Sequence, residues 1–267
     1  MAVTVVTLVA ENIYNWATSS ASAVNNDRNV EEAKKESIQK QPPFSVNAYY
    51  YHRSTEARVR LFPQRLTAKE EQQLLALQRT LKEVPEGLEV GLQAVVQFSR
   101  QGTPRLLTRV RLSIVGGWTQ PIFVRQLRAK VLQRSPPLAG AYLFHGDQGG
   151  EAPLEIGFNL DETRSLARVV KKDGISLGEA YMDRHVLELK PGEPKSIDVQ
   201  AFTDRSYCEW VIELDCDLGD ERRTVTIDDD GKPFRSTRLA PHYEDRYYAG
   251  IAGKWIAEGA GPAVFKI

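Results

Sequence analysis

The feature that most constrains the fold is the segment at residues 207–217, in which apolar and acidic side chains alternate. An extended chain points successive side chains to opposite faces, so this period of two predicts a strand with one buried face. The predicted buried face consists of Cys208, Trp210, Ile212, Leu214 and Cys216. The opposite face carries Glu209, Glu213, Asp215 and Asp217, and Val211 alone interrupts the pattern. A shift of one residue would drive carboxylates into the core, so the register is strongly specified.

Cys208 and Cys216 are the two cysteines of the chain, and both belong to this predicted strand. At about 3.3 Å per residue their Cα atoms would lie roughly 26 Å apart, whereas a disulfide needs Cα atoms within about 7 Å. We therefore expect that they do not bridge each other, and they lack the CxxC spacing of a zinc site. Two reduced thiols that face a core favour a cytoplasmic protein. Pairing between two chains stays open.

Short strand-like segments make up most of the rest of the chain, and turn-forming residues such as Gly116-Gly117 and Pro136-Pro137 separate them. The expected strands span residues 45–52, 57–62, 88–98, 106–115, 122–133, 140–144, 153–160, 185–189, 196–202 and 223–227. Many short strands at this spacing predict a mostly β fold, an antiparallel β-sandwich of immunoglobulin-like or jelly-roll-like type. We expect the first two strands to form a hairpin, and residues 161–170 allow a short helix.

One inserted helix is expected at about residues 67–84. Thr67 and Glu70 have the spacing of a capping box, in which each residue satisfies a backbone N–H of the other. Leucines then recur at helical spacing up to Val84, and Pro85 ends the segment. Residues 1–43 are polar from residue 25 onwards and end at Pro42-Pro43, so we interpret them as a helical or linker segment that precedes a domain at residues 44–267.

The first ten residues contain an apolar run, Val3 to Val9, directly after Met1. It is a poor secretory signal because no basic residue precedes it and Glu11 interrupts it. It is also about half as long as a membrane-spanning helix, which needs about 20 apolar residues. Three interpretations remain: a buried strand, a packed helix, or the last turns of a membrane segment that lies upstream of Met1.

Gly174-Ile175-Ser176-Leu177-Gly178 matches the G-x-S-x-G nucleophile elbow of serine hydrolases. Asp183 or Asp228, with His185 or His242, would complete a Ser, Asp, His order. That chemistry requires a sharp turn from a strand into a helix, which lifts the serine above a parallel sheet. No helix of adequate length follows this motif, and the chain lacks the alternating βα rhythm of a hydrolase. The sequence favours a plain loop, with the hydrolase kept as an alternative.

No pattern predicts a metal or a cofactor. The four histidines are not spaced to place two imidazoles on one helix turn or strand face. The acidic run at residues 228–230 lacks the alternate oxygen ligands and the distal glutamate of an EF-hand. A P-loop and a dinucleotide fingerprint are also absent from the sequence.

Charge is distributed unevenly although the formal net charge is zero. No acidic residue stands between Glu89 and Asp147, whereas residues 209–230 are rich in carboxylates. One interpretation is that opposite charges meet across neighbouring strands on the solvent faces. The other is an arginine-rich face that binds phosphates, anionic lipid or an acidic protein. The candidate binding residues for that face are Arg109, Arg111, Arg125 and Arg128. Trp118, on a turn after two glycines, either anchors a partner or folds back over the core.

The chain resembles uncharacterised β-rich proteins of actinomycete bacteria, which often carry N-terminal membrane segments. The resemblance covers roughly residues 109–240. The motifs that carry it are Cys208-Glu209-Trp210, Thr224-Val225-Thr226-Ile227-Asp228-Asp229, Gly231-Lys232-Pro233-Phe234, Lys190-Pro191-Gly192-Glu193 and Ser135-Pro136-Pro137. These motifs are structural, so the resemblance implies a β-rich fold and no particular activity. It supports the interpretation of the apolar run as the end of a membrane segment.

Together these patterns favour a non-enzymatic protein-interaction or scaffold module, located in the cytoplasm or attached to the inner face of a membrane through its N-terminus. The expected partner is a protein. The alternatives are binding of nucleic acid or anionic lipid through the arginine-rich face, and a serine hydrolase that uses Ser176.

Overall fold

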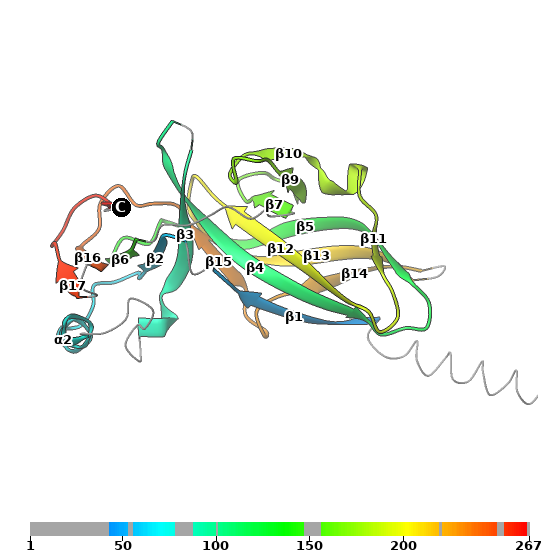
Figure 1. Ribbon diagram of the computed structural model, residues 1–267, viewed down its shortest axis with the longest axis horizontal. Helices are drawn as coiled ribbons and strands as arrows, with labels where there is room; N and C mark the ends of the chain where they lie inside the picture. The colour runs from blue at the N-terminus through cyan, green and yellow to red at the C-terminus, as the bar shows by residue number, and fades with distance from the viewer. Residues whose placement is uncertain are drawn as a thin grey trace, which may run out of the picture.

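The computed structural model describes residues 43–52, 56–77, 88–99, 101–146, 156–218, 221–249 and 254–265, and nearly all of its regular structure is strand (Figure 1). Within those ranges α2 (Ala68–Ala76) is the one α-helix, and two short 3-10 helices, η1 (Leu88–Val90) and η2 (Tyr181–Asp183), interrupt the strands. The prediction of a mostly β fold is therefore confirmed.

The larger of two sheets contains eleven strands. In spatial order these are β10 (Leu177–Ala180), β9 (Arg168–Val170), β7 (Ile156–Asn159), β12 (Pro194–Phe202), β4 (Pro104–Gly116), β3 (Leu92–Phe98), β2 (Arg58–Leu61), β6 (Ala141–His145), β16 (Asp245–Ala249) and β17 (Trp255–Ala257). The eleventh strand, β1 (Phe44–Tyr50), pairs with β4. This sheet is mixed rather than antiparallel, because β12 runs parallel to β7 and β16 runs parallel to β6.

The smaller sheet contains six strands, and all of its pairings are antiparallel. Its main path is β11 (Leu187–Leu189), β5 (Ile122–Ser135), β13 (Tyr207–Leu218) and β14 (Glu221–Ile227). In addition, β15 (Phe234–Thr237) pairs with β13, and β8 (Ser165–Leu166) pairs with β5. The expectation of antiparallel pairing therefore holds for this sheet and was wrong for part of the larger one.

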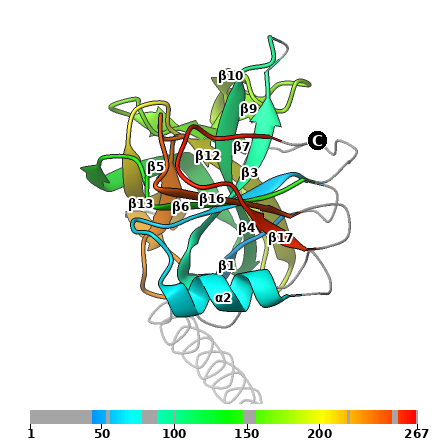
Figure 2. The ribbon, with the colours of Figure 1, turned by 90° about the vertical axis from the view of Figure 1, so that its left-hand side faces the viewer.

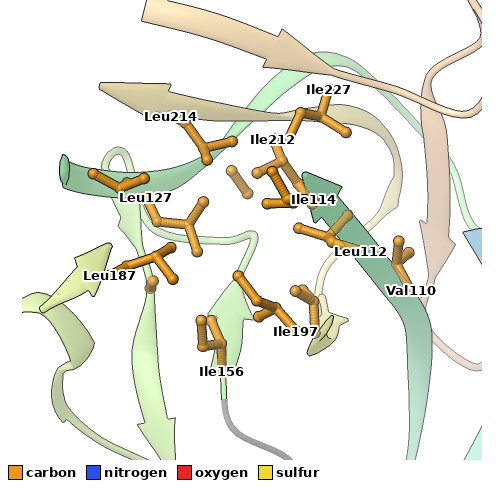
Figure 3. Packing of buried hydrophobic residues seen from close by; sticks show 14 of the residues in the cluster. Val110, Leu112, Ile114, Leu127, Ile156, Leu187, Ile197, Ile212, Leu214 and Ile227 are labelled. Carbon is orange, nitrogen blue, oxygen red and sulfur yellow. The ribbon is translucent and has the colours of Figure 1, made fainter. Parts of the chain in front are cut away.

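The two sheets face each other across one apolar core. Figure 3 shows residues of both sheets pointing toward one another, with Leu112 and Ile114 from β4, Leu127 from β5, and Ile212 and Leu214 from β13. All five side chains are almost completely buried. Neither sheet closes on itself, so the fold is a pair of packed layers. Its assignment as immunoglobulin-like or jelly-roll-like stays a prediction.

The alternating segment forms β13, at the centre of the smaller sheet, in the predicted register. Cys208, Trp210 and Cys216 are fully buried in the shared core, and both thiols are free. Burial, and to a smaller extent the carboxylates of Asp215 and Asp217, raise the pKa of the Cys216 thiol to about 12. The prediction that the two cysteines face a core without bridging each other is confirmed.

A second, smaller core lies where the larger sheet extends beyond the six-stranded one. There α2 lies beside β17 (Figures 1 and 2), and its Leu74 packs with Phe62, Leu143 and Trp255. The predicted capping box is present, because the Thr67 hydroxyl accepts from the Glu70 backbone N–H and Glu70 accepts from the Thr67 N–H at 2.7 Å. The helix ends earlier than expected, at Ala76, and residues 78–87 lie outside the described part.

The predicted hairpin was wrong, and a segment for which the sequence allowed a helix contains strands instead. β1 and β2 do not form a hairpin: β1 pairs with β4, whereas β2 pairs with β3 and β6. The reason is that β1 packs Phe44 against the shared core, while β2 buries Val59 and Leu61 in a separate cluster. Residues 161–170 form no helix, because β8 and β9 there complete the edges of β5 and β7.

The predicted N-terminal segment at residues 1–43 lies almost entirely outside the described residues, and nothing tests its boundary with residues 44–267. Among the helices that the structure describes, none has the length and apolar character needed to cross a bilayer.

Replacement of Trp210 should lower the free energy of unfolding more than replacement of an apolar residue at the surface. Its ring is fully buried against Phe158 and Phe234 at centroid distances of 6.1 and 5.1 Å. We expect Trp210→Ala to lower the free energy of unfolding by about 3 to 5 kcal/mol, because it leaves a cavity between the sheets. Urea titration followed by circular dichroism would measure this. The control Val186→Ala, at a side chain 76% exposed, should stay within about 0.5 kcal/mol of the parent.

Both thiols should be unreactive in the folded protein. Each is completely buried, and Cys216 has a raised pKa, so almost no thiolate is available near neutral pH. We expect titration with a disulfide reagent to modify neither cysteine in buffer and both in denaturant. Rapid modification without denaturant would contradict the position of β13 in the core.

Candidate functional site

The four candidate arginines do not form one face. Arg109 and Arg111 project from β4, and Arg125 and Arg128 project from β5. The residues that alternate with them, including Val110 and Leu127, belong to the core between the sheets. The two pairs therefore lie on opposite outer faces of the packed layers. This corrects the expectation of a single arginine-rich surface.

Arg111 is held by a carboxylate of the neighbouring strand. Its guanidinium donates to both oxygens of Asp198, at 2.6 and 2.9 Å, and stacks over the Tyr51 ring with 4.4 Å to the centroid. The hydrogen bonds to Asp198 raise the pKa of Arg111 above its ordinary value. A bidentate pair that also stacks on an aromatic ring fixes the guanidinium in the plane of the sheet face.

Arg109 is one of the most buried charged residues, with 4% of its side chain exposed. It forms an ion pair with Glu56, which is 10% exposed. A paired charge at this depth contributes to the specificity of packing more than to binding at the surface. Arg109 is therefore inaccessible to an outside ligand in this conformation.

The arginines of β5 pair with the acidic face of β13, which is the first of the two interpretations of the charge pattern. Arg128 donates to Glu213 at 2.7 Å and to Asp215 at 2.6 Å, Lys130 lies 3.0 Å from Glu213, and Arg125 pairs with Asp217. Burial by itself would raise the pKa of Glu213, but the hydrogen bonds from Lys130 and Arg128 hold it below its ordinary value. These cross-strand pairs occupy most of the positive charge on this outer face.

Of the two interpretations of Trp118, an anchor for a partner or a ring that folds back over the core, the structure shows the second. The turn after β4 folds the indole back so that 9% of the residue is exposed, and it packs in the same core cluster as Phe44 and Ile122. An aromatic ring on a turn gains more from covering an adjacent core than from water.

Ser176 lies in a tight loop before β10. Its hydroxyl donates to Asp173 at 2.6 Å, and Asp173 also accepts from the Ser176 backbone N–H. His185 stacks on Tyr181 and its Nδ1 lies 2.9 Å from the Tyr181 carbonyl oxygen, while Asp183 belongs to η2. Within the described residues no hydrogen bond joins Ser176 to His185. The partner of the serine hydroxyl is therefore a carboxylate and not the histidine that a hydrolase triad requires, and a strand rather than a helix follows the serine.

His52 lies in a polar cluster in which both ring nitrogens contact nitrogen atoms of other side chains. The two ring nitrogens of His52 lie 2.6 Å from an Arg58 nitrogen and 2.5 Å from the Gln93 amide nitrogen. Burial lowers the pKa of His52, and the positive charges of Arg58 and Arg60 lower it further, so the imidazole is neutral near pH 7. In the part of the chain that the structure describes, no three potential ligands gather around a common point.

A concave feature with several charged side chains in its lining is a groove of about 650 Å³ along β5. Seven consecutive residues of the strand, 128–134, line it together with Glu162, Thr163, Arg164 and Glu213. Successive side chains of a strand point to opposite faces, so a groove lined by every residue in turn must run along the edge of the strand. We call this feature the β5 groove.

The β5 groove exists because neighbouring strands cover only part of that edge. On one side β5 pairs with β13 along residues 123–135. On the other side β11 covers residues 122–124 and β8 covers only Arg128 and Ala129. Among the described strands, none pairs with residues 130–135 on the side away from β13. Along that side of residues 130–135, no strand of the described ranges therefore supplies partners for the backbone N–H and C=O groups.

Leu132 marks the centre of this open edge. Gln133 pairs with Glu209 and Val131 with Trp210, so Leu132 is the extra residue of a β-bulge, and 54% of it is exposed. A bulge reorients one side chain relative to the regular alternation. It places an apolar side chain at the surface between Lys130 and Arg134. Sequence reasoning missed this residue, although the adjacent apolar pair Val131-Leu132 breaks the period of two.

Comparison of the chain with family models, with curated proteins and with solved structures gives no match. The resemblance to β-rich actinomycete proteins therefore stays a prediction, and the candidate site stands on its geometry.

Removal of the Glu56 carboxylate should show how much the ion pair between Glu56 and Arg109 contributes to the free energy of unfolding. Glu56→Gln leaves the Arg109 charge in the interior without its counter-ion, so we expect the free energy of unfolding to fall by about 3 to 5 kcal/mol. The matched control is Glu179→Gln, which breaks the exposed pair with Arg184 and should cost less than about 1 kcal/mol. Equal effects in denaturant titrations would show that Arg109 is not held by Glu56.

Proposed function

We propose that this protein is a non-enzymatic interaction module and that the β5 groove is its binding surface for a partner protein. The observation that carries the proposal is an open strand edge with an exposed leucine at its centre. Proteins normally cover such edges or place charges on them, because an open edge pairs with other chains. An uncovered edge with an apolar contact point is therefore a favourable place for recognition.

Of the predicted binding residues, Arg128 lines the β5 groove, where Glu213 and Asp215 hold it. Arg109, Arg111 and Arg125 do not line the groove and are held by Glu56, Asp198 and Asp217, so the proposal does not use them. Binding of nucleic acid or anionic lipid is less favoured, because it requires many accessible cations on one face. A hydrolase is also less favoured, because Ser176 donates to Asp173. The sandwich type, the cytoplasmic location and attachment to the inner face of a membrane stay predictions.

A photo-crosslinking amino acid at position 132 would test the proposal. We expect illumination of cells that produce the variant to join the protein to one or a few discrete protein partners, because the side chain of Leu132 projects into the contact. The matched control carries the same amino acid at position 186, where the side chain is even more exposed.

The partner bands should be specific to position 132 and should disappear when Lys130→Glu is added. Crosslinks of equal intensity at both positions would indicate random encounters. Absence of any crosslink at position 132 would refute the β5 groove as the binding surface.

A further inference from the structure

The β5 groove also indicates how its partner is held. Resting on the function proposed above, we infer that the β5 groove binds an extended, acidic segment of the partner, which adds to the edge of β5 as a further strand beside β8.

The backbone of β5 offers hydrogen bonds at this edge. The Leu127 carbonyl accepts from the Ala167 N–H at 2.9 Å, on the side away from β13. Because an antiparallel strand directs alternate residues to alternate edges, the peptide groups of Ala129 and Val131 point to the same side. β8 covers Ala129 through its pairing with Ser165. Val131 is the next position in this row, and no described strand covers it.

The length of the open edge fits one short strand. Residues 130–135 span about 20 Å at about 3.3 Å per residue, which is the length of a typical strand of five to six residues. Leu132 lies at the middle of this stretch and supplies an apolar contact for the incoming segment. Main-chain hydrogen bonds would provide affinity, and side-chain contacts would select the sequence.

Charge selects an acidic segment. The lining of the β5 groove includes four cations, Arg128, Lys130, Arg134 and Arg164, and two carboxylates. Both carboxylates are already paired, Glu213 with Arg128 and Glu162 with Arg168. Arg164 forms no ion pair among the described residues, and Lys130 is 58% exposed while it shares Glu213 with Arg128. Arg134 lies 3.6 Å from Asp161 and is therefore also paired. The groove side chains that stay available for a ligand are thus Lys130 and Arg164, and both are positive.

A second copy of this chain fits the edge less well. Pairing of two identical β5 edges about a two-fold axis would bring Lys130 and Arg164 of one copy toward the same cations of the other. Like charges on directly opposed strands destabilise the pairing. The favoured occupant is therefore a different chain with carboxylates at alternate positions.

Labelled peptides of about eight residues would test the inference with the full-length protein. The probe alternates glutamate and valine, and its charge control alternates lysine and valine. We expect fluorescence anisotropy to show saturable binding of the glutamate peptide only. Lys130→Glu with Arg164→Glu should weaken it about tenfold or more. The matched control, Arg222→Glu with Arg223→Glu on β14, should leave it unchanged.

N-methylated peptides would test whether the peptide binds through main-chain hydrogen bonds to the edge of β5. Two versions of the glutamate peptide carry N-methyl groups on alternate residues, in opposite phases. An added strand uses the N–H groups of one phase only, so one version should lose binding and the other should keep it. Loss in both phases or in neither would overturn strand addition, as would binding of the lysine peptide or no binding at millimolar concentration.

These results are separable from the test of the proposed function. Discrete crosslinks at position 132 together with failure of the peptides would keep the interaction module and reject the acidic strand. Dimerisation that depends on protein concentration and is abolished by Leu132→Asp would assign the edge to a second copy and also overturn the inference.

Discussion

The apolar row on β13 is the constraint on which the rest of the structure depends. β13 pairs with β5, β14 and β15, and its Trp210 packs against Phe158 of the opposite sheet. The indole N–H donates to Ser236, which in turn donates to Thr108 of β4, so a buried polar chain also joins the sheets. Because unpaired polar groups inside a core are costly, these two hydrogen bonds hold the two sheets in one relative position.

Once the inner faces are joined, the outer faces determine where charge can lie. The carboxylates of β13 face outward beside β5 and neutralise Arg125 and Arg128, whereas Arg109 and Arg111 lie on the far side with their own acidic partners. A chain segment without acidic residues therefore gives no single basic face. The cations of the β5 groove that stay accessible are Lys130, which is 58% exposed although it shares Glu213 with Arg128, and Arg164, which forms no ion pair among the described residues.

The β5 groove follows from the lengths of strands. β5 is longer than the combined cover that β11 and β8 provide, so part of its edge stays open. The bulge at Leu132 arises because β5 has one more residue than β13 across this stretch. Period-two reasoning predicted the strand but not the bulge, because a bulge depends on the partner strand and its register. The β5 groove thus depends on which strands pair with β5 and along which residues. The sequence of β5 alone does not show that part of its edge stays unpaired.

The sequence by itself determined the class of the fold, the register of β13, the fate of both cysteines and the capped start of α2. Each of these depends on side chains that are neighbours along the chain, whose burial or capping follows from strand and helix periodicity. Only the tertiary structure decided that β1 and β2 belong to different cores, that Trp118 folds inward, that the arginines divide between two faces and that β5 keeps an open edge. These outcomes depend on which distant strands become neighbours, and local patterns carry no information about that choice.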